Sequence, residues 1–161
     1  MSNFESYQRL KIFALTIVIL VLSAVAFMFY RSAYSSNHPA DKKFLIETVE
    51  IDGKALNVNL AVSEEEKITG LSGTESLAGN WGKLFVYQKP LTPSFWMRGM
   101  NFPIDIIWID NGRVIETDRN LPPDNGEATY TPDSPVDAVL ETPAGWVDEK
   151  NIVKGDRVMY K

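Results

Sequence analysis

The stretch of residues 105–118 reads DIIWIDNGRVIETD. Two apolar runs flank the pair Asn111-Gly112, and such a pair between extended runs is a strong signal for a two-residue β-hairpin, because both turn positions need positive φ. The pair Asp52-Gly53 separates residues 44–51 from residues 54–62 in the same way. Two tight hairpins predict a chain that folds mainly as antiparallel β-sheet.

The residues on either side of these hairpins add short strands and little helix. Extended runs are expected at residues 83–88, before Pro90, and at 137–142 and 157–160. Ser63 and Glu66 match a capping box, which predicts a short helix ending near Gly70. Residues 145–151 predict a second short helix, and 120–135 a long loop with four prolines, a length that is often functional.

The fold class that follows is mainly β (α+β). We expect a small closed or nearly closed β-barrel with one or two short helices, because closure removes exposed strand edges. The glutamates at 64–66 fit the positive end of the first helix, which is a simpler interpretation than acid–base chemistry.

A separate apolar segment precedes this domain. Residues 12–30 read IFALTIVILVLSAVAFMFY, without a charged side chain, and are long enough to cross a bilayer as a helix. Arg9 and Lys11 precede the segment, as in an uncleaved signal anchor. Residues 24–26 (AVA) fit a cleavage site, so secretion after removal of a signal peptide is the alternative.

These features divide the chain into four parts. Residues 1–11 are expected to be a short cytoplasmic tail, 12–30 a transmembrane signal anchor, 31–43 a polar linker, and 44–161 the β-rich domain. The expected location is therefore the cell membrane, with a single pass, the membrane bound through residues 12–30, and the globular domain extracytoplasmic.

The composition excludes several classes of chemistry. The 161 residues include no cysteine and a single histidine, His38, which falls in the linker. Thiol nucleophiles, His-rich metal sites and a Ser-His-Asp triad are therefore not expected in the folded domain, and we expect neither metal nor cofactor. A net charge of −5 argues against a nucleic-acid partner.

Several motifs occur together in a fixed order along the β-rich part. They are Gly70-Leu71, residues 84–86 (LFV), residues 95–110 (FWMRGMNFPIDIIWID), residues 139–145 (VLETPAG), Ile152 and residues 155–158 (GDRV). In this order the chain resembles the bacterial and archaeal domain-of-unknown-function family 192 over residues 44–161. The resemblance implies a compact β-rich domain, commonly secreted or membrane-attached, and no established activity. Ser72 and the pair Gly99-Met100 depart from residues that many members carry.

Residues 95–105 hold the most unusual side chains of the domain. Trp96, Arg98 and Met100 lie within five positions, and an aromatic face beside a guanidinium suits a sugar ring or an anionic group. The simpler interpretation is packing, in which the apolar side chains of this segment close one end of the barrel (Phe95, Met97, Met100 and Phe102). The functional interpretation expects Trp96 and Arg98 at the mouth of a pocket formed with the loop at 120–135.

Three acidic residues are candidates for acid–base chemistry: Asp105, Asp118 and Glu141. Two carboxyls across one cleft can hydrolyse a glycoside if their pKa values differ. Asp105 and Glu141 are also candidate ligand contacts. The structural alternatives are that Asp105 accepts backbone N–H groups and that Glu141 pairs with Arg98 or Arg119.

Three functions remain open from sequence. The first is a binding or accessory module for a cell-envelope polymer or a partner protein, built on Trp96, Arg98, Met100, Asp105 and Glu141. The second is a carboxylate-dependent hydrolase of envelope glycan, and the third is a structural scaffold in a membrane complex. Because no nucleophile–base pair is visible, the sequence favours the first, and whether the chain is an enzyme stays open.

Overall fold

The computed structural model describes residues 23–28 and 46–161 of the chain. The chain divides into two units, residues 1–43 and 44–161, and each is considered by itself. In the first unit, residues 23–28 are helical, and the rest of the expected tail, anchor and linker lies outside the described residues. Within 23–28 and 46–161, no helix has the length and apolar character needed to cross a membrane.

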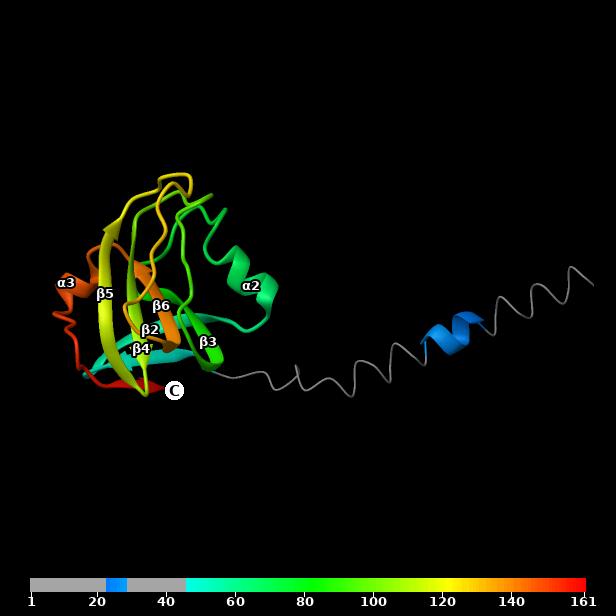
Figure 1. Ribbon diagram of the computed structural model, residues 1–161, viewed down its shortest axis with the longest axis horizontal. Helices are drawn as coiled ribbons and strands as arrows, with labels where there is room; N and C mark the ends of the chain where they lie inside the picture. The colour runs from blue at the N-terminus through cyan, green and yellow to red at the C-terminus, as the bar shows by residue number, and fades with distance from the viewer. Residues whose placement is uncertain (1–22, 29–45) are drawn as a thin grey trace, which may run out of the picture. The chain divides into compact units, whose positions relative to one another are not determined.

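The second unit is mainly β, as the sequence predicts, and its seven strands form one curled sheet with the order β5-β4-β6-β3-β2-β1-β7 (Figure 1). The strands are β1 (Thr48–Ile51), β2 (Lys54–Ala61), β3 (Trp81–Leu91), β4 (Ile104–Asp110), β5 (Arg113–Leu121), β6 (Val136–Pro143) and β7 (Val158–Tyr160). Two short helices accompany them, α2 (Glu64–Thr69) and α3 (Trp146–Glu149).

Both predicted hairpins are confirmed. Strands β1 and β2 pair antiparallel across Asp52 and Gly53, which have φ values of 46° and 82°. Strands β4 and β5 pair antiparallel across Asn111 and Gly112, with φ values of 48° and 65°. Positive φ at both turn positions is the reason that Asn-Gly and Asp-Gly pairs favour this geometry.

Helix α2 connects the parallel neighbours β2 and β3. Its predicted capping box is confirmed, since the Ser63 side chain accepts the Glu66 N–H and the Glu66 carboxylate accepts the Ser63 N–H. The helix ends where predicted, at Gly70, with φ of 53°. A parallel pair needs such a crossover, so this helix is fixed beside the ends of both strands.

The sheet curls into a half-barrel, and its two edge strands touch at one end only. Arg113, at the start of β5, bridges Arg157, the residue before β7. The N–H of Val114 also donates to the carbonyl oxygen of Asp156 at 3.0 Å. The expected closed barrel is therefore realised as a half-barrel with this single junction between its edges.

The two faces of the sheet carry separate apolar clusters. The inner face contributes residues from all seven strands, and Leu140 of β6 lies there together with α3. The outer face carries a second cluster, which includes Phe85 and Val139 and is covered by the segments that connect the strands. Because side chains alternate along a strand, Glu141 shares the outer face with Val139.

Strands β3 and β5 each continue three residues past their predicted ends. Strand β3 continues through Pro90 to Leu91, although the sequence predicts that Pro90 ends it. Its register with β6 shifts between Val86 and Leu91, and a proline is tolerated at such an irregularity because no ladder N–H is required. Strand β5 runs to Leu121, so the long loop begins after that residue.

Candidate functional site

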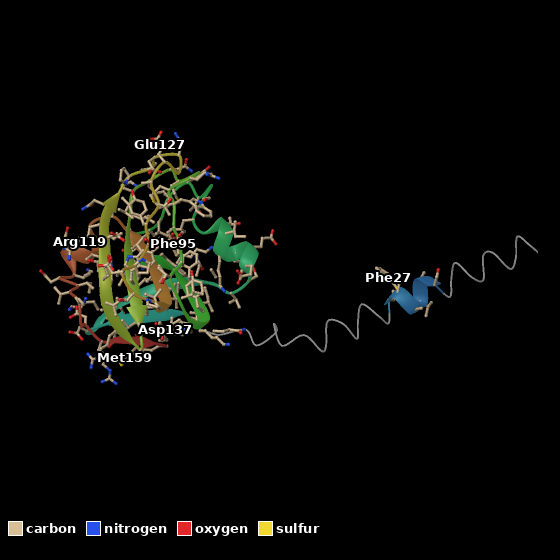
Figure 2. All side chains as sticks on the ribbon, viewed as in Figure 1. Phe27, Phe95, Arg119, Glu127, Asp137 and Met159 are labelled. Carbon is tan, nitrogen blue, oxygen red and sulfur yellow. The ribbon has the colours of Figure 1, made fainter. Side chains whose placement is uncertain are left out.

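The segment that connects β3 and β4 lies over the outer face of the sheet. Phe95 exchanges two backbone hydrogen bonds with Tyr130 of the long loop, at 2.9 and 2.8 Å. Its ring packs edge-on against Phe85 and Trp108, with centroids 4.9 and 5.5 Å apart. Figure 2 shows Phe95 among the dense side chains in the middle of the domain. This anchoring fixes the position of the neighbouring Trp96.

A cavity of about 170 Å³, partly open to solvent, lies between this segment, the outer face and α2. Its walls are largely aromatic and apolar. They include Phe85, Tyr87, Phe95, Trp96 and Met100. Trp96 is 40% exposed at the rim, whereas Phe85 is fully buried. Small-molecule sites are typically concave and apolar with a few polar groups, and this cavity has that composition.

The acidic group that lines the cavity from the sheet is Glu141, on the interior strand β6. Glu141 is 5% exposed. Among the described residues its side chain has no hydrogen-bond partner, and the Oε2 atom is completely buried. Buried polar atoms are almost always paired, so an unpaired carboxyl oxygen on a residue that lines a cavity needs an explanation.

Burial determines the protonation of this carboxyl. Desolvation raises the pKa of Glu141 to about 8, and the opposing effect of the Lys83 ammonium, across the β3–β6 ladder, is smaller. At neutral pH the side chain is therefore mainly an uncharged carboxylic acid. Desolvation, together with the charges of Glu64 and Glu141, raises the pKa of Tyr87 to about 12, so its phenol also keeps its proton.

Helix α2 forms the remaining wall and brings charges that are already paired. The ammonium of Lys67 is 3.0 Å from the Glu64 carboxylate and 5.0 Å from the centre of the Tyr87 ring. At the end of the helix, a Cβ atom on Gly70 would lie 4.0 Å from both carboxyl oxygens of Glu141. The glycine thus leaves the space above the carboxyl open.

The family model DUF192, described as "Uncharacterized ACR", matches residues 47–160. The chain belongs to the DUF192 family. The predicted resemblance is therefore confirmed over nearly the whole β-rich part.

Two solved structures are similar to the chain. A protein of Sinorhizobium meliloti 1021, described as a candidate transcription regulator, is 29% identical with a TM-score of 0.67, and the match covers 71% of this chain and 92% of that one. A protein of unknown function from Novosphingobium aromaticivorans DSM 12444 is also 29% identical with a TM-score of 0.67, over 76% and 89%. No functionally curated protein matches the chain significantly.

In this DUF192 domain, three of the residues singled out from sequence come together. Trp96, Met100 and Glu141 all line the cavity. Arg98 does not line it: its guanidinium lies 5.8 Å from the Trp96 ring centre, and its side chain packs against Gly126 of the long loop. The expected pocket between Arg98 and that loop is thus replaced by one between Trp96 and α2.

The other two acidic candidates lie elsewhere. Asp105 is fully buried on the inner face, where its carboxylate accepts the N–H groups of Asn120 at 2.8 Å and Val147 at 2.9 Å. This is the structural role considered from the sequence. Asp118 accepts the indole N–H of Trp108 at 2.7 Å. Neither lines the cavity with Glu141.

The expected pairing of Glu141 with Arg98 or Arg119 is wrong. Arg119 bonds to Asp148 instead, and Figure 2 shows it on the side of the domain that carries α3. The reason is the alternation along the strands, because Arg119 follows Asp118 and points away from the outer face. The domain leaves Glu141 with no ion pair among the described residues.

Sequence reasoning missed the residues that β3 and α2 add to the site, namely Phe85, Tyr87 and Lys67. Phe85 lies in one of the quoted family motifs, and Gly70 opens another, so the motif order is a signal that could have pointed to this site. Within residues 23–28 and 46–161, no group of three His, Cys, Asp or Glu side chains is arranged to hold a metal ion.

Proposed function

We propose that this DUF192 domain is a binding module whose cavity at Glu141 receives one small group of a cell-envelope molecule or a partner protein. The observation that carries the proposal is the buried, unpaired carboxyl oxygen at a partly open, aromatic cavity. Leaving such a group unsatisfied costs folding free energy. A ligand that hydrogen-bonds to it would recover that cost and gain aromatic contact.

The size of the cavity limits what can enter. A volume of about 170 Å³ corresponds to about six water-sized groups, at ~30 Å³ for each water in the liquid. One ring or one side chain fits this space, and a length of polymer does not. An envelope polymer or a partner would therefore insert a single terminal or projecting unit.

The membrane context of the module is also part of the proposal. It is supported by the uncharged residues 12–30 and by the basic residues before them. A tether of this kind would hold the domain at the extracytoplasmic side, near ligands of the envelope. Secretion after signal-peptide cleavage is the alternative.

The two other functions have less support. Glycoside hydrolysis needs two carboxyls across one cleft, and Asp105 and Asp118 are each committed to protein donors away from the cavity. The remaining acid at the cavity, Glu64, is paired with Lys67. A scaffold role would leave the unpaired carboxyl of Glu141 without a purpose.

The proposal is tested with a matched pair of variants. Trp96 and Trp81 are 40% and 38% exposed, but only Trp96 lines the cavity beside Glu141. We expect Trp96→Ala to weaken capture of solubilised envelope fragments by the full chain roughly tenfold, the effect of losing about 1.4 kcal/mol of contact. Trp81→Ala should bind like the original chain. Equal binding by both variants would contradict the proposed site.

The orientation is tested separately, with the absence of cysteine as an advantage. A single cysteine introduced as Lys154→Cys lies at an exposed position of the domain. In intact cells it should react with a membrane-impermeant maleimide, while Ser2→Cys in the expected cytoplasmic tail should react only after lysis. The reverse pattern would place the domain in the cytoplasm.

A further inference from the structure

We infer that the cavity recognises an uncharged carboxamide group on a small apolar body, held by two hydrogen bonds to the Glu141 carboxyl. The inference rests on the proposed binding function and specifies its ligand. It follows from three features of the site: the neutral state of the carboxyl, the lack of any competing partner, and the chemistry of the walls.

The neutral state follows from the groups around Glu141. A buried carboxylate is stable only with donors or a counter-ion, and no hydrogen bond reaches this side chain from the described residues. Lys83 lies opposite in the ladder without an ion pair to Glu141, and Lys67 is tied to Glu64. The carboxyl therefore keeps its proton, as its pKa of about 8 indicates.

Two further titratable groups, Tyr87 and Asp118, lie on the same side of the sheet as Glu141 and do not change this state. Tyr87, on β3, stays a neutral phenol because burial raises its pKa to about 12. Asp118 lies on β5, beyond Ile106 of β4, and its carboxylate is occupied by an indole N–H. Neither supplies a positive charge that would ionise Glu141.

A carboxylic acid offers one donor and one acceptor side by side. A carboxamide is complementary to both, since its carbonyl oxygen accepts the O–H and its N–H donates to the other carboxyl oxygen. A ketone or ether would use only the donor. Oε2 is enclosed by protein in this structure, so the Glu141 carboxyl must turn toward the cavity before a ligand can reach both oxygens. A carboxamide then leaves neither oxygen unsatisfied.

The walls select the rest of the ligand. Phe85, Phe95, Trp96 and Met100 provide an apolar surface suited to a planar or aliphatic body. A cationic group would meet the ammonium of Lys67, which lines the cavity, and it would have to ionise Glu141 first. An anionic group has two or more oxygens that need donors, and the buried carboxyl of Glu141 offers it a single O–H donor.

The test uses three probes with the same ring: benzamide, benzylamine and benzoate. The full chain in nanodiscs is titrated with each, and the indole N–H signal of Trp96 is followed by NMR at pH 6.5 and pH 9. Benzamide should bind at pH 6.5 at least tenfold more tightly than either charged probe. At pH 9 its apparent affinity should fall about tenfold, because with a pKa of about 8 roughly one-tenth of the Glu141 side chains keep the proton.

Two variants isolate the carboxyl. Glu141→Gln keeps a neutral donor and acceptor, so benzamide should bind within threefold of the original affinity and lose its dependence on pH. Glu141→Met has a similar length but can form neither hydrogen bond, so binding should fall at least tenfold. Unchanged backbone amide spectra establish that both variants fold.

The possible results separate the two proposals. Tighter binding of benzylamine or benzoate, or benzamide binding that strengthens with pH, would overturn the carboxamide inference while the cavity remains a binding site. The carboxamide inference would also be wrong, and the cavity would still be a binding site, if no probe binds but Trp96→Ala weakens capture of envelope fragments. If neither experiment shows binding that depends on the cavity, both proposals are wrong.

Discussion

The buried carboxyl of Glu141 makes the stability of the domain depend on pH. In the folded chain its pKa is about 8, whereas an ordinary glutamate, as in the unfolded chain, has a pKa of 4.5. Below pH 4.5 both states bind the proton, and Glu141 has no effect on the pH dependence. Above this value the unfolded chain releases the proton and the folded chain retains it, so rising pH favours unfolding. The decrease in the free energy of unfolding stops near pH 8, where the folded chain also releases the proton.

The size of the effect follows from the pKa difference. Each unit is worth about 1.4 kcal/mol, so ionisation of the unfolded chain lowers the free energy of unfolding by about 3 kcal/mol at pH 7 and by about 5 kcal/mol well above pH 8. A domain of this size is stable by only about 5–15 kcal/mol. The carboxyl of Glu141 therefore removes a substantial part of the stability at neutral and alkaline pH.

The variant Glu141→Gln tests this prediction, because glutamine has nearly the same shape and does not titrate. Urea unfolding of the full chain, followed by tryptophan fluorescence, gives the free energy of unfolding at pH 5, 7 and 8. Between pH 5 and pH 8 the original chain should lose roughly 3–4 kcal/mol more than the variant. Glu47, an exposed glutamate, provides the control for the substitution itself, because Glu47→Gln removes no buried carboxyl.

One result would refute the reasoning directly. If the free-energy difference between the original chain and Glu141→Gln stays constant from pH 5 to pH 8, Glu141 does not take up a proton on folding. The carboxyl would then have a partner that keeps it ionised, and the neutral site inferred above could not exist.

Three further predictions concern the scaffold of the site. Gly82→Ala would place a Cβ atom 2.6 Å from a backbone oxygen of β6 and should destabilise the domain by about 3 kcal/mol in urea unfolding. In the control, Gly79→Ala, the added Cβ meets nothing within 4 Å, so this variant should be as stable as the original chain. Similar unfolding midpoints for the two variants would contradict the close approach at Gly82. Asp105→Ala leaves two backbone N–H groups without their acceptor and should lower the free energy of unfolding by about 3 kcal/mol in the same assay. A loss below about 1 kcal/mol would show that water replaces the carboxylate. Ser63→Ala removes the cap of α2 and should cost about 1 kcal/mol, seen as faster amide hydrogen exchange in that helix, while unchanged exchange would mean that the cap is not needed.

The local parts of the fold could be predicted from sequence because their causes are local. Asn111-Gly112 and Asp52-Gly53 fix their hairpins through backbone conformation, and Ser63 with Glu66 fixes the start of α2. The order of the strands could not be predicted in this way. Strand β6 lies between β3 and β4, and β2 runs parallel to β3, which are pairings that no turn specifies.

The candidate site could also be predicted only in part from the sequence. Trp96 and Met100 stood out because they belong to an unusual cluster, and Glu141 because it ends an apolar run. Their wall on β3 and α2 was missed, because only the pairing of β3 with β6 brings Tyr87 near Glu141. The misplacement of Arg98 has a similar origin, since its contact with Gly126 depends on where the long loop lies.

The two most deeply buried acids of the domain differ in a way that bears on function. Asp105 accepts two backbone N–H groups and joins β5 to α3, so the fold alone accounts for an acid at that position. Glu141 lies on the neighbouring strand with no such donor among the described residues, at a position where an apolar side chain of similar volume would fold more stably. A residue that weakens the fold and opens on a cavity is best explained by what enters the cavity. The contrast therefore makes Glu141, and not Asp105, the residue whose substitution should change binding without harming the scaffold.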